Sequence, residues 1–150
     1  MKPKIVPLDP EREAMFAVFL KELREHGDEA FFSPHPFTDE WAKKLAHYEG
    51  KDYYCVAVVD KRVVGYGMLR GWDEGYSRPS LGIAVHPDER GKGLSKQLMS
   101  HLHEVARKRG AKQMRLRVKV DNLVAVGLYR KLGYELKPEQ PTFLEGLLNL

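Results

Sequence analysis

The chain has 150 residues and a mass of 17.2 kDa, and its 43% hydrophobic and 31% charged residues describe one domain with a substantial core. Its single cysteine, Cys55, excludes an internal disulfide, and no cluster of cysteine and histidine suggests a zinc site. No stretch approaches the roughly 18 apolar residues of a membrane span, and the N-terminus lacks the apolar core of a signal peptide. We therefore expect a single domain over residues 1–150, without a metal or membrane contact, in a reducing cytoplasm.

The net charge of +4 is unevenly distributed along the chain. Residues 86–120 hold ten lysines and arginines against three acids, a balance of +7, whereas the remainder sums to −3. A segment this basic is expected to meet an anion. It contains no Phe, Tyr or Trp on which bases could stack, so we expect a small anionic ligand and no nucleic acid.

The first half of the chain has the pattern of a strand, two helices and a hairpin. Pro34 and Pro36 interrupt the helical periodicity and leave an aromatic loop over residues 28–37. Asp60 and Lys61 form a tight turn between two β-branched runs, which indicates a hairpin. The expected elements are a strand over 4–8, a helix over about 10–26, a helix that begins after Thr38 and ends at Gly50, and strands over 53–59 and 62–72.

The second half alternates strands and helices. Leu94, Leu98 and Leu102 form an apolar stripe at helical spacing, whereas residues 113–119 alternate apolar and basic side chains as a half-buried strand does. The order β-α-α-β-β-β-α-β-α-β-β predicts an α/β fold with a mixed sheet and helices on both faces. The expected elements are a strand over 80–85, a helix from 94 that Gly110 ends, a strand over 113–119, a helix capped by Asp121 or Asn122, and strands over 134–137 and 143–150.

The segment over residues 81–99 joins a strand to an amphipathic helix through a glycine loop. Such a helix start presents unpaired N–H groups and a positive dipole end, which together bind phosphate. Gly91 and Gly93 let an anion approach the main chain, and Arg90, Lys92 and Lys96 add charge. The loop is neither a Walker loop nor a G-x-G-x-x-G fingerprint. By itself, a single G-x-G is equally well explained as a sharp turn whose neighbouring basic side chains are exposed to solvent.

Two motifs together resemble the GNAT superfamily of N-acetyltransferases. The loop is similar to that family's [QR]-x-x-G-x-[GA] signature, with Arg90 first and Gly93 central, although Ser95 stands where the family has Gly or Ala. The second signature, N-x-x-A-x-x-x-Y-x-x-x-G-[FY], is matched by Asn122, Ala125, Tyr129, Gly133 and Tyr134. The resemblance implies a GNAT-type fold with a central, mostly antiparallel sheet, and acetyl-CoA as co-substrate.

The resemblance also implies roles for individual residues. The strand before the loop would pair with the pantetheine arm, and the Val85 amide would polarise the thioester carbonyl. Amides of the loop would hold the pyrophosphate, and Asn122 would contact the pantetheine or help to open the gap between neighbouring strands. Tyr129 would protonate the leaving thiolate as a general acid. The cofactor-binding residues implied are Ile83, Ala84, Val85, Arg90, Gly91, Lys92, Gly93, Leu94, Ser95, Lys96 and Asn122.

We expect the acceptor to be a primary amine of a small molecule, such as an amino sugar or a nucleotide-linked amino sugar. Rigid prolines, aromatic rings and one imidazole in the loop over residues 28–37 suit a small polar ring, and the near-neutral remainder of the chain is compatible with a cationic amine. The candidates for the group that accepts the amine proton are His35, Asp73, Glu74 and His86. The residues assigned to substrate binding are His35, Phe32, Trp72 and Glu74.

Two other functions stay open at this point. In the first, the acceptor is a protein lysine or N-terminus. The GNAT subgroup that acetylates protein N-termini, however, commonly has a glutamate where this chain has Arg117. The other is a non-catalytic acyl-CoA-binding domain, which would not need Tyr129. Cys55 lies in an apolar strand and is expected to be a core thiol, so the acetyl group is expected to move directly to the amine. The oligomeric state also stays open, a homodimer included.

Overall fold

The computed structural model describes residues 2–30 and 32–150. Its strands form one seven-stranded sheet in the order β1-β2-β3-β4-β5-β7-β6. Neighbouring strands are antiparallel except β4 and β5, which are parallel. The strands are β1 (Lys4–Pro7), β2 (Tyr53–Val59), β3 (Arg62–Arg70), β4 (Ser80–Val85), β5 (Gln113–Lys119), β6 (Glu135–Gln140) and β7 (Phe143–Asn149).

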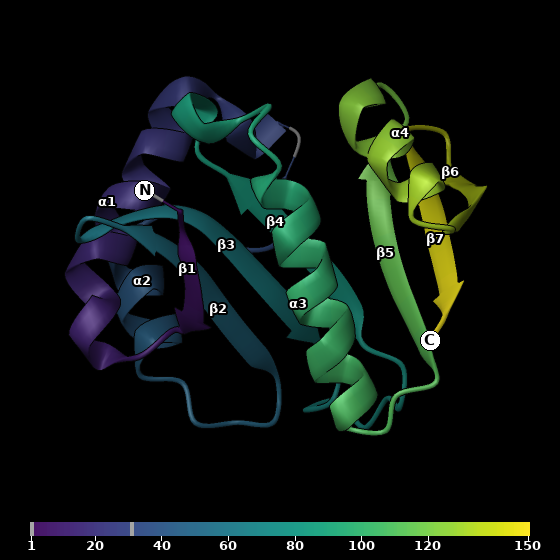
Figure 1. Cartoon of the computed structure of the whole chain (residues 1–150), viewed down its shortest axis with the longest axis horizontal. Helices are drawn as coiled ribbons and strands as arrows, with labels where there is room; N and C mark the ends of the chain where they lie inside the picture. Colours follow the sequence, from purple (N-terminus) through teal and green to yellow (C-terminus); the bar gives the residue numbers. More distant parts are fainter. Residues whose placement is uncertain (1, 31) are drawn as a thin grey trace.

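Helices cover both faces of this sheet (Figure 1). On one face, α1 and α2 pack over the first strands, and on the other face α3 and α4 share a second apolar cluster. The expected fold class and order of elements are therefore confirmed. The helices are α1 (Glu13–His26), α2 (Asp39–Ala46), α3 (Leu94–Lys108) and α4 (Leu123–Lys131), with single 3-10 turns η1 (Pro10–Arg12), η2 (Asp28–Ala30) and η3 (Pro87–Glu89).

Local chemistry explains where several elements begin. The Thr38 hydroxyl accepts the Trp41 N–H at 3.2 Å and caps α2. The Asn122 side chain accepts the Ala125 N–H at 3.4 Å and caps α4, so it is Asn122 rather than Asp121 that begins the last helix. The hairpin turn between β2 and β3 is formed by Asp60 and Lys61, whose φ angles of 48° and 63° suit a primed turn.

Three predicted boundaries are wrong by two residues or more, and one of them is the strand predicted over 134–137, which runs over Glu135–Gln140. The second helix ends at Ala46 rather than at Gly50, and the Tyr48 hydroxyl then fixes the following loop by accepting the Asp52 N–H at 2.8 Å. The third strand ends at Arg70 rather than at residue 72. There the Asp52 carboxylate accepts the backbone N–H groups of residues 71, 72 and 73 at 3.0, 2.9 and 3.2 Å, which turns the chain out of the sheet.

The sheet is nearly interrupted at its centre. Strands β4 and β5 share a single residue pair, Ser80 with Arg115, at their N-terminal ends, and Figure 1 shows β5 running apart from β4. On either side of this gap, β3 pairs with the whole of β4, and β7 pairs with the whole of β5. None of the helices in the described residues is long and apolar enough to cross a membrane.

Candidate active site

Peptide groups of β4 face the gap between β4 and β5. The His86 N–H donates to the Val64 carbonyl at 2.9 Å, so His86 and Val64 form a hydrogen-bonded pair of the antiparallel ladder. Hydrogen-bonded and non-hydrogen-bonded pairs alternate along such a ladder. The register therefore directs the N–H and C=O groups of Ala84 toward β3 and those of Ile83 and Val85 toward the gap. The Arg90 side chain donates to the Val85 carbonyl, and the other three groups are open to an extended chain lying in the gap.

A row of unpaired amides continues from the end of this strand. Among the described residues, no hydrogen bond is donated by the backbone N–H groups of residues 91–96, and the first helical bond of α3 runs from the Gln97 N–H to the Gly93 carbonyl at 3.2 Å. Gly91 and Gly93 have φ angles of 78° and 86°, and a Cβ on either would meet nothing within 4 Å. The loop is therefore an open concave row of donors at the positive end of a fifteen-residue helix.

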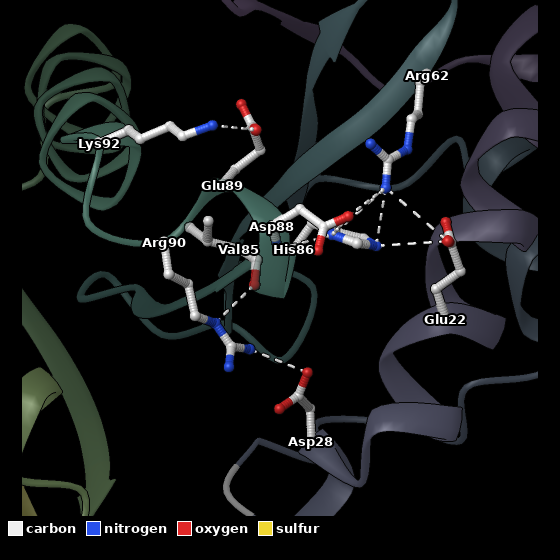
Figure 2. Close-up of polar contacts among 9 residues, drawn as sticks. All are labelled: Glu22, Asp28, Arg62, Val85, His86, Asp88, Glu89, Arg90 and Lys92. Atoms are coloured by element: carbon white, nitrogen blue, oxygen red, sulfur yellow. Dashed lines mark hydrogen bonds and ion pairs between the residues drawn. The ribbon is translucent and has the colours of Figure 1, made fainter.

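Arg90 was expected to bind the cofactor, but in the structure it contacts two groups of the protein. Its Nε donates to the Val85 carbonyl at 3.1 Å, and its Nη2 lies 2.9 Å from the Asp28 carboxylate (Figure 2). Its charge is thus partnered by an acid of the η2 turn, and it ties the end of β4 to that turn. Lys92 is also partnered, because its Nζ lies 3.0 Å from Glu89, as Figure 2 shows.

His86, a candidate for the group that accepts the amine proton, is buried at the turn, although its place before Pro87 predicts exposure to solvent. Its exposed fraction is 5%, its Nδ1 accepts the Asp88 N–H at 3.1 Å, and its Nε2 lies 3.0 Å from Arg62 and 3.5 Å from Glu22 (Figure 2). These contacts cap η3 and join it to α1 and β3. His86 therefore serves the fold of the loop and does not line the cavity described below.

Tyr129 belongs to the apolar cluster that also holds Val85, from the end of β4, and Leu94, from the start of α3. Strands β4 and β5 are parallel, so the segments that follow them, the glycine loop and α4, lie at the same edge of the sheet. Tyr129 is 7% exposed, and burial raises its pKa to about 12. Its hydroxyl therefore remains protonated at neutral pH and is able to give up a proton only to a strong base formed beside it.

The Tyr134 hydroxyl and the Cys55 thiol belong to the same apolar cluster as Tyr129 and contribute to the core. Tyr134 packs 5.9 Å from Tyr129, centroid to centroid, and its hydroxyl forms a 2.7 Å hydrogen bond with His103 Nε2. Cys55 is fully buried, and burial raises the pKa of its thiol to about 12. A thiol that is buried and protonated is a poor nucleophile, so Cys55 is a core residue in this structure.

A cavity of about 1290 Å³ opens on the other face of the sheet, beside the same gap. Its wall includes Phe32, whose Cε1 would lie 3.0 Å from a Cβ at position 82, so Gly82 is required for the ring to approach β4. Glu29 and Glu74 contribute carboxylates. The other lining segments include residues 33–34, residues 68, 70 and 71 at the end of β3, the turn over 76–78, the start of β4, residues 110 and 112, and the face of β5 opposite α3.

Two of the four residues assigned to substrate binding, Phe32 and Glu74, line this cavity. His35 does not: it is 6% exposed, its Nε2 lies 2.9 Å from the Tyr66 hydroxyl, and its ring stacks on Trp41. Trp72 is also elsewhere, with the Arg109 guanidinium 4.6 Å from its ring centroid. These placements favour structural roles for His35 and Trp72. The neighbouring aromatic residue Phe31 lies outside the described residues.

The basic residues of segment 86–120 do not all surround the glycine loop, as their charge had led us to expect. Arg115, Arg117 and Lys119 alternate along β5 with apolar residues of the α3 cluster, and their side chains face the cavity rather than the glycine loop. Six basic residues line the cavity against two acids. The alternation along residues 113–119 is visible in the sequence. That the basic side chains face this cavity depends on the order of strands in the sheet, which the sequence does not show. The basic residues missed as site residues are Arg70, Arg78, Lys112, Arg115, Arg117 and Lys119.

Comparisons with known proteins agree on one family. Its model, the acetyltransferase (GNAT) family, matches residues 20–134. An acetyltransferase from Pectobacterium atrosepticum is 37% identical over 93 residues, which cover 62% of this chain and 63% of that protein. One from Sodalis glossinidius is 36% identical over 95 residues, which cover 63% and 64%. The chain thus matches less than two thirds of the length of these relatives.

Solved structures share the fold at low sequence identity. The GNAT domain of S. lividans PAT has a TM-score of 0.84 at 15% identity, covering 99% of this chain and 90% of that one. The PaiA N-acetyltransferase from Thermoplasma acidophilum, in complex with coenzyme A, has a TM-score of 0.78 at 17% identity over 100% of both chains. These similarities show the fold. Among the described residues, no group of three or more acids, cysteines and histidines is placed to hold a metal.

Proposed function

Because the chain belongs to the acetyltransferase (GNAT) family, we propose that it transfers the acetyl group of acetyl-CoA directly to a primary amine of a small molecule. The observation that carries this proposal is the gap between β4 and β5. It joins the peptide groups of Ile83 and the Val85 N–H, which face the gap, to the unpaired amides of residues 91–96, and the cavity opens beside it. The relative from Thermoplasma acidophilum that was solved in complex with coenzyme A supports the choice of cofactor.

The residues present fit such a cofactor. The pyrophosphate would accept hydrogen bonds from the amides of residues 91–96, and Lys96, on the first turn of α3, would add positive charge. The N–H and C=O groups of Ile83 and the N–H group of Val85 would pair with the pantetheine arm as a neighbouring strand does. Arg90 would act indirectly, by holding the Val85 carbonyl and the loop in place.

The bound cofactor supplies an activated thioester, and the protein supplies polarisation and a proton. The amine nitrogen attacks the thioester carbon, a C–N bond forms and the C–S bond breaks. The Val85 N–H donates to the carbonyl oxygen as it gains charge, and the Tyr129 hydroxyl donates its proton to the departing thiolate. The amine proton passes to solvent, because Glu74, the candidate base that lines the cavity, lies in the turn between β3 and β4, at the Ser80 end of β4 and not at its Val85 end.

This function predicts release of CoA from acetyl-CoA when small primary amines are supplied. Tyr129→Phe is expected to lower kcat by about 100-fold or more, because it removes the general acid, and to leave the Kd for CoA nearly unchanged. CoA release is followed with a thiol reagent, and CoA binding by calorimetry.

The same assay, run with a lysine-containing peptide and a free peptide N-terminus, distinguishes the alternatives. Faster turnover with either peptide would replace the small-molecule acceptor by a protein. Tight CoA binding without CoA release for any amine or peptide would instead support a non-catalytic acyl-CoA-binding domain.

A further inference from the structure

Three residues form a row across the floor of the cavity. Arg70 pairs with Ser80 between β3 and β4, and Ser80 pairs with Arg115 between β4 and β5. Side chains of directly paired residues project from the same face of a sheet, and adjacent strands lie about 4.8 Å apart. Accordingly, Arg115 Nη1 donates to the Ser80 hydroxyl at 3.4 Å, and all three residues line the cavity. Ser80 thus lies between two arginines on the cavity face of the sheet.

Part of the positive charge at this row is not neutralised by the protein. Arg115 is ion-paired with Glu145 at 2.7 Å and with Glu139 at 3.3 Å. Arg70, by contrast, donates to the Pro34 carbonyl at 3.1 Å, and Arg78, two residues before Ser80, donates to the side-chain oxygen of Gln113 at 2.9 Å.

Both of those acceptors are neutral, and among the described residues neither Arg70 nor Arg78 forms an ion pair. Each keeps further N–H groups for a ligand. Two unneutralised guanidinium groups in a concave site attract and concentrate anions there.

The cavity has the opposite charge at its other end. Glu29 follows Asp28, and the Asp28 carboxylate is held by Arg90, which also holds the Val85 carbonyl. Glu29 therefore lies near the Val85 end of the gap, where the amine must react under the proposed function. Ser80 and Val85 are five residues apart on β4, about 16 Å along an extended strand. A ligand that touches both ends is elongated, with its amine far from its other charge.

On this basis, and resting on the proposed function, we propose that the acceptor carries an anionic carboxylate or phosphate group remote from its amine, and that Arg70, Arg78 and the Ser80 hydroxyl bind this group. Arg115 completes the subsite by holding the Ser80 hydroxyl. Its own charge is largely compensated. The class of acceptor is thus an elongated amino acid or amino phosphate rather than a simple cationic amine.

Matched pairs of acceptors test this proposal. We compare 12-aminododecanoate with 12-aminododecanamide for a carboxylate, and 12-aminododecyl phosphate with 12-aminododecanol for a phosphate, because their extended chains match the separation of Ser80 and Val85 on β4. The anionic member of at least one pair is expected to have a kcat/KM about 10- to 100-fold higher than its neutral partner, the range expected for a hydrogen bond to a charged group. The pair with the larger ratio identifies the anion. Equal values in both pairs, or higher values for the neutral members, would overturn the proposal.

Variants connect the preference to the named residues. Arg70→Gln and Arg78→Gln are each expected to lower kcat/KM for the anionic member about 10-fold, through KM, and to leave the neutral member unchanged. The matched control is Arg107→Gln, at an exposed arginine of α3 on the opposite face whose nearest acid is Glu104 at 4.0 Å. A loss that is equal for both members of a pair would show that the arginines support the fold and not the anion.

Direct binding separates this proposal from the proposed function. The protein is saturated with CoA, so that the glycine loop is filled, and binding of each matched pair is measured by calorimetry. Preferential binding of an anionic member that is lost in Arg78→Gln supports the subsite even where no acetyl transfer occurs, in which case only the proposed function fails. Equal binding of both members overturns the subsite even where transfer is observed.

Discussion

The protonation of Tyr129 gives its proposed role a pH signature. Burial favours the neutral phenol and raises its pKa to about 12, so the hydroxyl keeps its proton well into the alkaline range. With a good acceptor, kcat is therefore expected to show no alkaline decline up to about pH 10, the ordinary pKa of tyrosine. The measurement is the pH profile of CoA release for the wild-type protein and for Tyr129→Phe. An alkaline fall centred near pH 10 in the wild type alone would contradict the burial argument.

Arg90 illustrates how a basic residue in a phosphate-binding motif contributes without touching phosphate. Its two contacts, to the Val85 carbonyl and to Asp28, predict that Arg90→Gln and Asp28→Asn each raise the Kd for CoA a few-fold and that their effects are not additive. A double-mutant cycle by calorimetry measures the coupling. Lys96→Gln is the comparison, because removing a positive charge that contacts phosphate directly also reduces the salt dependence of CoA binding. Additive effects, or an Arg90→Gln variant with the salt response of Lys96→Gln, would restore a direct role for Arg90.

Among the elements, the glycine loop and α4 offer a matched pair of substitutions. A Cβ at Gly93 would meet nothing within 4 Å, but its φ of 86° is strained for alanine, so Gly93→Ala is expected to cost about 1 kcal/mol and to weaken CoA binding. Gly127 lies inside α4, also with nothing within 4 Å of a Cβ. Gly127→Ala is therefore expected to stabilise the protein by about 0.5–1 kcal/mol. Urea unfolding gives both values, and the same sign for the two variants would refute the distinction.

The elements that could be predicted from sequence are those whose local pattern decides their structure. The strands over 53–59, 80–85 and 113–119 were placed to the residue, because their periodicity and their turns point the same way. The ends of β3 and α2 were not, since they depend on Asp52 and Tyr48 reaching across a loop. The glycine loop followed from its motif. The anionic subsite did not, because Arg70 and Arg115 become neighbours of Ser80 only through the sheet order.

For the whole molecule, buried histidines predict how stability depends on pH. Burial lowers the pKa of His35, His101 and His103 from the ordinary value of 6.5. The unfolded chain therefore binds more protons than the folded one below about pH 6.5, and the free energy of unfolding is expected to fall as the pH decreases from 7.5 to 5.5. Urea unfolding at the two pH values measures this fall, which should be smaller in His35→Gln. Stability that is constant or higher at acidic pH would disprove the argument.

The separation of β4 and β5 also has a consequence for colloidal behaviour. Beyond the Ser80–Arg115 pair, each strand presents an unpaired edge inside what is formally a continuous sheet. Exposed strand edges are templates for pairing with other chains, and natural proteins usually blunt or cover them. Here the edge has to stay receptive, because an extended ligand must be able to lie along it. The feature that suits the protein to hold such a ligand thus also makes the empty protein the form more prone to aggregate.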